Sequence, residues 1–250
     1  MPDLRLIRAE VLKLRRRPGL VAATGVPAFA SAVAYFAVLA VLHALDPSGH
    51  AGPGGAHHFD DAMGILAMAA PVAGVLAGAT AGGADIEAGV FRDLAATGRS
   101  RTALFLARLP GAWALVVPPV VAAVAASALI ATLAPGPGGA PAPHDIAGGG
   151  GSALVGAMVV CAASVGLAAL SGSRGMVIGV VLAFQLGVSP LLGQVGALGD
   201  ARHAIPSIAV ARLDGALADE FALATAILVL AAWTAVTVGA GLWRTRTQEI

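Results

Sequence analysis

The sequence contains one lysine, one cysteine, few aromatic residues and little charge of either sign. Charged residues occupy 12% of the 250 positions, whereas a soluble domain carries about 25%. Aromatic residues make up 4% and are not interleaved with basic ones, which argues against nucleic-acid binding. The single cysteine, Cys161, cannot form an intrachain disulfide, so we expect it to be a small packing residue. The composition therefore excludes an ordinary soluble domain.

Common catalytic motifs are also missing. A P-loop needs a glycine-rich loop followed by Lys and Ser or Thr, but the only lysine, Lys13, lies in the sequence LKLRR. There is no HExxH zinc motif. Ser171 and Ser173 lie at the opposite end of the apolar segments from all six histidines, so no Ser–His pair can form. We therefore expect no catalytic, cofactor-binding or metal-binding residue, and no enzymatic activity from this chain alone.

Long apolar runs dominate what is present, and the mean hydropathy is +0.85. Each run is long enough to cross about 30 Å of hydrocarbon as a helix, and the runs are continuous rather than alternating, which excludes a β-barrel. The first run is far longer than the apolar core of a signal peptide, so we expect it to be retained. We predict an all-α polytopic membrane protein whose transmembrane domain, residues 19–250, has six spans at about 19–45, 62–84, 109–134, 152–172, 175–197 and 221–243.

Basic residues fall almost entirely on one side of these spans. The other side has only Arg202 and Arg212, with eight acidic residues. Because cytoplasmic loops collect Lys and Arg, we predict that both termini are cytoplasmic. The preference for Arg over Lys, with abundant Ala, Gly and Pro, suggests a bacterial inner or plasma membrane. Thirteen of the 15 cations share the cytoplasmic side: Arg5, Arg8, Lys13, Arg15, Arg16, Arg17, Arg92, Arg99, Arg101, Arg108, Arg174, Arg244 and Arg246.

Residues 1–18 predict a separate amphipathic helix. Leu4, Ile7, Val11 and Leu14 recur at helical spacing and share one face, while basic residues project elsewhere. Such a helix lies in the membrane interface instead of crossing it, and Pro18 ends it. The alternative is an ordinary basic flank with no helix of its own.

Small residues predict where helices pack closely. Gly74, Gly78 and Gly82 share one face of the second span, and Gly175 and Gly179 repeat this spacing in the fifth. Lipid provides no hydrophobic drive for helix association, so close backbone approach through small residues does the packing. The pattern leaves open whether these contacts form within the chain or between two copies.

Prolines predict helix bends. Pro118 and Pro119 lie inside the third span, where each lacks an N–H and clashes with the preceding turn, so we expect a kink. Pro27, Pro71 and Pro190 are candidates for smaller bends in the first, second and fifth spans.

Three external connections join the spans. Residues 46–61 are rich in Gly and Pro, and we expect a solvated loop; the alternative is a metal site formed by its His and Asp residues. Residues 135–151 predict a low-complexity linker. Residues 198–220 carry too few apolar residues to span, which favours a short amphipathic or re-entrant segment.

The cytoplasmic loop at 85–108, DIEAGVFRDLAATGRSRTALFLAR, is long and basic, and it resembles the permease subunits of ABC-2-type ABC transporters. In that family an acid precedes a Gly by four residues, and a Leu-rich turn, a Pro, a Ser-Arg pair and a basic residue entering the third span follow. This chain departs from the pattern with Asp for Glu, Gly for Pro, and Val90 where Thr is common. The matching positions are Asp85, Gly89, Leu94, Gly98, Ser100, Arg101 and Arg108.

Two further segments agree with the resemblance. RAEVLKLRRRPGL resembles the family's N-terminal interface helix, and HAIPSIAVARL resembles the short external segment between the fifth and sixth spans. The resemblance implies that the 85–108 loop forms a coupling helix docking into a separate ATPase subunit. The residues expected to serve this coupling are Asp85, Glu87, Gly89, Arg92, Leu94, Gly98, Arg99, Ser100 and Arg101.

These expectations combine into one functional prediction. The chain is expected to be a permease subunit that pairs with a second permease and an ABC ATPase in the lipid bilayer. The resemblance implies that the ATPase, not this chain, binds ATP and Mg²⁺, and that the transporter exports its substrate. Small apolar residues in the spans favour a hydrophobic or amphipathic substrate. The alternative is an ATPase-independent integral membrane binding or scaffold protein.

Overall fold

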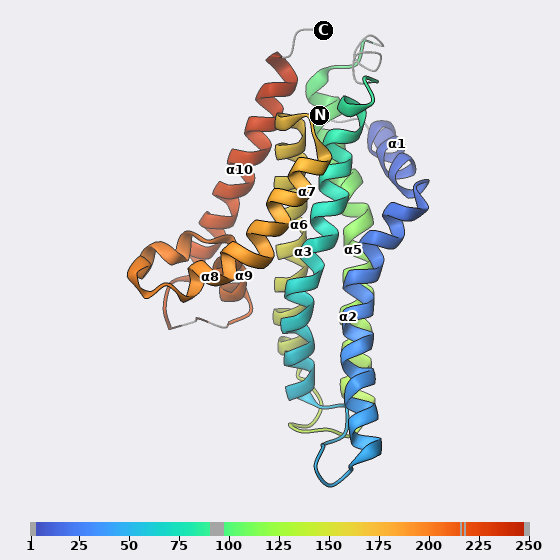
Figure 1. The fold of residues 1–250 in the computed structure, drawn as a ribbon, viewed down its shortest axis with the longest axis vertical. Helices are drawn as coiled ribbons and strands as arrows, with labels where there is room; N and C mark the ends of the chain where they lie inside the picture. Colours follow the sequence, from blue (N-terminus) through green and yellow to red (C-terminus); the bar gives the residue numbers. More distant parts are fainter. Residues whose placement is uncertain (1–3, 91–97, 216, 218, 248–250) are drawn as a thin grey trace.

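The computed structural model describes residues 4–90, 98–215, 217 and 219–247. These residues form helices joined by short connections, and the first helix and the end of the last helix lie at the same end of the molecule (Figure 1). The bounds are α1 Leu4–Arg15, α2 Pro18–Leu45, α3 Ala56–Glu87, α5 Arg101–Leu133, α6 Pro143–Ser171, α7 Arg174–Ala183, the π-helix η1 Phe184–Val188, α8 Ser189–Gln194, the 3₁₀ segment η2 Gly196–Ala204, α9 Pro206–Leu213 and α10 Leu223–Thr247.

Six helical stretches within the described residues are long and apolar enough to cross a membrane, which makes the chain a polytopic membrane protein. They correspond one to one with the six predicted spans. The fifth stretch, Arg174–Gln194, is continuous through α7, η1 and α8. Helix α1 packs against α5, and its Leu14 is fully buried against the bundle. The all-α architecture and the N-terminal helix are thus confirmed.

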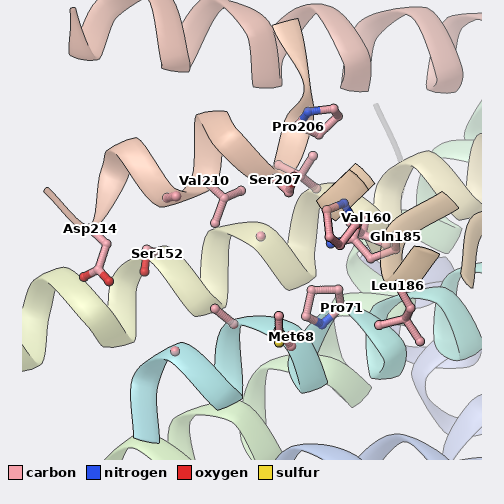
Figure 2. Close-up of a pocket in the computed structure, with 16 residues that line it drawn as sticks. Met68, Pro71, Ser152, Val160, Gln185, Leu186, Pro206, Ser207, Val210 and Asp214 are labelled. Atoms are coloured by element: carbon pink, nitrogen blue, oxygen red, sulfur yellow. The ribbon is translucent and has the colours of Figure 1, made fainter. Parts of the chain in front are cut away.

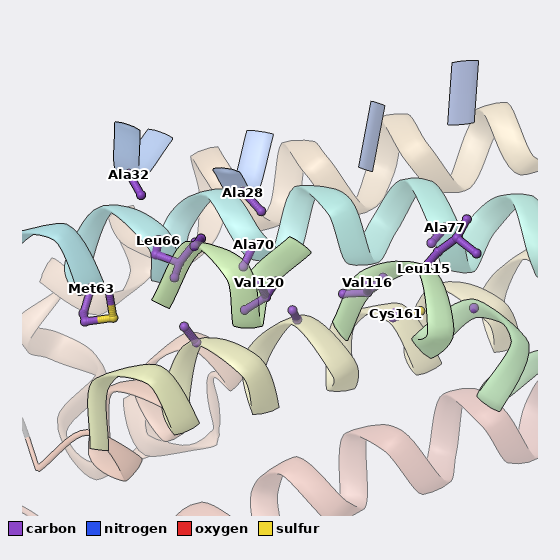
Figure 3. Close-up of a cluster of buried hydrophobic side chains, with 14 of the residues drawn as sticks. Ala28, Ala32, Met63, Leu66, Ala70, Ala77, Leu115, Val116, Val120 and Cys161 are labelled. Carbon is purple, nitrogen blue, oxygen red and sulfur yellow. The ribbon is translucent and has the colours of Figure 1, made fainter. Parts of the chain in front are cut away.

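Helices α3 and α6 form the centre of the bundle. More than half of the apolar window of each is buried, whereas α2, α10 and the fifth stretch expose most of theirs. Figure 3 shows the core where α2, α3, α5 and α6 meet, with Ala28, Leu66, Val120 and Cys161 among its buried side chains. Most of these core residues are small, so helix backbones approach closely, as expected where lipid surrounds the bundle.

A glycine seam joins α3 to α6. A Cβ added at Gly74 would lie 2.5 Å from the carbonyl oxygen of Ala157, and Cβ atoms at Gly78 and Gly82 would overlap carbonyl groups one and two turns along α6. The same spacing on α7 behaves differently, because added Cβ atoms at Gly175 and Gly179 would meet nothing within 4 Å. The seam is therefore a contact within the chain, and the α7 glycines face outward.

The external loops differ from the expected solvated loop and linker. Gly54 and Ala56 donate backbone hydrogen bonds to Pro135 and Gly139, at 3.0 and 2.7 Å, so the two glycine-rich segments pair with each other. Gly55 donates to Ala131 in the last turn of α5 at 2.9 Å. The expected linker 135–151 is wrong in its second half, because α6 already begins at Pro143. Gly149 and Gly150 are buried in the helix, and a Cβ at Gly149 would lie 2.8 Å from the Met63 side chain. Glycine here permits close packing instead of flexibility.

Proline has unequal effects along the chain. Helix α5 continues as a single helix through Pro110, Pro118 and Pro119. In the fifth stretch, Pro190 is the second residue after the π-helix η1. Because Pro190 cannot donate a hydrogen bond to the carbonyl of Leu186, a wider turn there accommodates the missing donor and the ring.

Candidate functional site

One end of the molecule gathers the residues that the resemblance singled out. Helix α1, the connection between α3 and α5, and the last turn of α10 all lie there (Figure 1). We call this the basic end. The connection runs from 88 to 100 and is shorter than the predicted loop 85–108, because α3 continues to Glu87 and α5 begins at Arg101. Arg92 and Leu94, two of the predicted coupling residues, lie outside the described residues.

The two ends of this connection are fixed by local chemistry. Gly89 follows the last residues of α3 with φ of +70°, and Gly98 precedes α5 with φ of +80°. Such left-handed backbone is readily adopted only by glycine. Ser100 is the N-cap of α5, and its hydroxyl accepts a hydrogen bond from the backbone N–H of Ala103 at 3.1 Å. These three residues therefore set where the helices stop and start, whatever docks on them.

Asp85 lies inside the bundle. It is 7% exposed, and its carboxylate accepts from Lys13 Nζ at 2.8 Å and from Arg108 at 3.4 Å. Arg108 is 1% exposed and also donates to the carbonyl oxygen of Gly82 at 2.9 Å. Lys13 further pairs with Glu10 at 2.6 Å. We call Glu10, Lys13, Asp85 and Arg108 the buried charge cluster. It joins α1, α3 and α5, so Asp85 serves helix packing and offers no exposed docking surface.

Glu87 links the end of α3 to the start of the fifth stretch. Its two carboxylate oxygens accept from the Arg174 backbone N–H at 2.6 Å and pair with the Arg174 guanidinium at 3.0 Å. A carboxylate at a helix N-terminus also meets the positive end of the helix dipole. The ion pair and the hydrogen bond thus connect the end of α3 to the start of α7.

A second tie holds the end of α10 against the start of α5. Arg246 Nε donates to the Thr102 hydroxyl at 3.0 Å, and the Arg101 guanidinium donates to the Arg246 carbonyl at 3.3 Å. Arg99 is exposed beside them. Two predicted basic coupling residues belong to the described part of the chain: Arg99 lies at the surface, and Arg101 is hydrogen-bonded to the Arg246 carbonyl of α10.

Acid and imidazole side chains do not converge into a metal-binding group of three within the described residues. His58 hydrogen-bonds the Gly54 carbonyl at 3.0 Å, and Asp61 accepts from the Tyr35 hydroxyl at 2.9 Å. These two side chains of the 46–61 segment thus have structural partners near the start of α3.

A cavity of about 440 Å³ lies between α3, α6, η1 and α9. It is separate from the buried charge cluster, none of whose residues lines it. Figure 2 shows Asp214 and Ser152 at one end of it and Gln185 and Leu186 at the other. Sequence reasoning did not single out Gln185, although an amide in the middle of an apolar span is a visible signal. Asp214 gave no such signal, because it was one of eight external acids.

No known protein-family model matches this chain, and no curated protein matches it.

Proposed function

We propose that this chain is the permease subunit of an ABC-2-type ABC transporter, driven by ATP hydrolysis in a separate ATPase subunit. The observation that carries the proposal is the build of the basic end. A short connection between α3 and α5 is anchored on both sides by ion pairs and a helix cap, so a force on it reaches the helix bundle.

The basic end supplies what a coupling element needs. Connection 88–100 has an exposed surface at its described ends, including Arg99. Asp85 and Glu87, directly before it, tie α3 to α1, α5 and α7. Displacement of the connection by an ATPase would therefore move several spans together.

Sidedness supports the same assignment. Thirteen of 15 cations lie at or next to the basic end by the predicted topology, which would place it in the cytoplasm where ATP is available. The opposite orientation of the chain in the membrane would place the coupling surface outside the cell. Export, a second permease copy and a hydrophobic or amphipathic cargo are parts of the proposal that the family resemblance contributes.

A second candidate is an integral membrane binding protein that needs no ATPase. The cavity between α3, α6, η1 and α9 favours it, because that cavity is formed by a single chain without any partner. A scaffold role would share the topology and the same lack of catalytic residues.

The test is a mild-detergent pull-down of the tagged chain from its native membrane, with mass spectrometry of the co-purified proteins. The proposal expects a stoichiometric soluble P-loop ATPase with wild type and its loss with Arg99→Glu and Arg101→Glu together. Arg8→Glu is the matched control, because it reverses an exposed charge at the same end on α1. An ATPase that stays bound to the double variant rejects the docking role of this connection. Its reproducible absence from folded wild type favours the binding protein.

A further inference from the structure

The cavity has walls that suit the apolar body of a ligand. Its volume of about 440 Å³ falls in the range of small-molecule sites, roughly 300–1,000 Å³. Most of the lining is apolar, from Ala67 and Pro71 on α3, Val160 on α6 and Val210 on α9. At its edge, Met68 and Leu186 are 64% and 54% exposed. Apolar residues exposed on a span face lipid, so the cavity is open towards the hydrocarbon.

One end of the cavity carries an exposed carboxylate that has no ion-pair partner among the described residues. Asp214 lines the cavity at the end of α9. Among the described residues, its side chain has no ion pair or hydrogen-bond partner. Oδ1 lies beside the glycine stretch of α6, 3.5 Å from where a Cβ of Gly149 would be. Burial raises the pKa of Asp214, and the negative charge of Asp60 adds to that rise. A cation beside this carboxylate would offset both effects.

A second polar group lies at the other end of the cavity. Gln185 belongs to the π-helix η1, and no hydrogen-bond partner for its amide occurs within the described part of the chain. The hydroxyl groups in the lining are satisfied, since Ser152 donates to the Gly149 carbonyl and Ser207 bonds Ser189. A polar side chain within a span is costly unless it has a partner, and π-helical turns frequently mark functional sites. The amide is thus available to a ligand.

We propose that this cavity binds an amphiphilic organic cation, with the apolar body between α3, α6 and α9 and the positive charge beside Asp214. The exposed apolar edge gives entry from the lipid, and the carboxylate gives selection by charge. That this ligand is the transported cargo rests on the proposed function, but binding itself needs no ATPase.

Two lipophilic ions of the same shape and opposite charge provide the test. Tetraphenylphosphonium is the cation and tetraphenylborate the anion. Binding of each is measured by equilibrium dialysis against the full chain in nanodiscs of zwitterionic lipid, with empty nanodiscs subtracted. We expect saturable binding of the cation and none of the anion at the same concentrations. Asp214→Asn should weaken cation binding about tenfold, which corresponds to about 1.4 kcal/mol.

Two further variants separate charge from shape. Asp219→Asn removes a nearby exposed carboxylate that does not line the cavity, so it should leave the cation affinity within a factor of two. Val210→Trp fills the cavity from α9 and should abolish cation binding, with thermal unfolding confirming that the variant is folded. Because Asp214 and Val210 act through charge and volume respectively, their effects do not share a cause.

The outcomes are distinct from those of the pull-down. Equal binding of both ions, or a cation affinity unchanged in Asp214→Asn, overturns the inference even if an ATPase co-purifies. Unchanged cation affinity in folded Val210→Trp also overturns it. Cation binding that depends on both residues, with no ATPase found, sustains the inference and rejects the permease proposal.

Discussion

The glycine seam between α3 and α6 makes a quantitative prediction about Gly74. In Gly74→Ala the new Cβ would lie 2.5 Å from the Ala157 carbonyl oxygen, 0.9 Å closer than the 3.4 Å at which ordinary contact begins. The obstacle is backbone, so no side-chain rotation relieves it and the helices must separate. Overpacking of this kind costs about 1–3 kcal/mol. The better helix propensity of Ala returns up to about 1 kcal/mol, and subtracting that full gain leaves a net destabilisation of up to about 2 kcal/mol.

Gly179 is the matched control for this change. It has the same small-residue spacing in a span, but an added Cβ meets nothing within 4 Å. Gly179→Ala therefore keeps the propensity gain without the clash, and we expect stability to be unchanged or raised by up to about 1 kcal/mol. Comparing the two variants tests whether the position of a glycine in the bundle, and not its sequence pattern, decides how its substitution by Ala changes stability.

Thermal unfolding of the chain in detergent micelles measures both variants. Trp113 is a suitable fluorescence reporter, because its indole N–H donates to the Met158 carbonyl of α6 at 3.0 Å, close to the seam. Each kcal/mol shifts the midpoint by roughly 2–4 °C in a chain of this size. The reasoning about the seam is refuted if Gly74→Ala unfolds at the same temperature as wild type or above it. It also fails if Gly179→Ala is destabilised equally.

Three other predictions use similar measurements. Asp85→Asn should destabilise the chain by about 3 kcal/mol, since it leaves buried Arg108 without its carboxylate. Lys13→Met changes a partly exposed side chain and should cost about 1 kcal/mol. Equal losses in the two variants would contradict the prediction that the buried Arg108 partner matters more. Asp214→Asn should raise the free energy of unfolding at pH 7 by less than about 0.5 kcal/mol, and with it the midpoint slightly. The reason is that the raised pKa of Asp214 makes its charged form unfavourable in the folded state. The stability gain of Asp214→Asn should shrink as the pH falls through the raised pKa, and it should vanish below about pH 3.9, where the carboxyl is protonated in the unfolded state too. A gain that persists at low pH would contradict this prediction. If the outward glycines of α7 meet a second permease copy, Gly179→Leu should lower the cross-linked dimer fraction in lipid, while an unchanged fraction places the dimer contact elsewhere.

The spans were predictable because length and apolar composition decide membrane insertion. The ends of the helices were less predictable. The sequence suggests that α3 stops near 84 and α5 starts near 109, because charges appear there. In the structure both helices continue, since Asp85 and Arg108 neutralise each other inside the bundle. A charge marks the end of an apolar run, but only its partner decides whether the helix ends too.

The glycine patterns show a second limit. Gly74 and Gly179 are equivalent in the sequence, yet one is pressed against α6 and the other faces outward. Spacing defines a face that permits close approach, and the remaining packing determines which face is used. Glycines at 148–151 were misread for a similar reason. A run of four suggests a flexible linker in isolation, whereas beside Met63 and Val124 it lets α6 pack closely against α3 and α5.

The ties of α3 suggest how the basic end and the cavity are related. The seam joins α3 to α6 from Gly74 to Gly82, so we expect these two helices to move as one body. The fifth stretch has little of its surface buried and is held to α3 at the basic end by the Glu87–Arg174 pair. Its π-helix η1 carries Gln185 and forms one end of the cavity wall. If an ATPase displaces connection 88–100, the fifth stretch is therefore the span that can move against the α3–α6 body. That movement would change the volume of the cavity, so the coupling surface and the ligand site would be linked through α7.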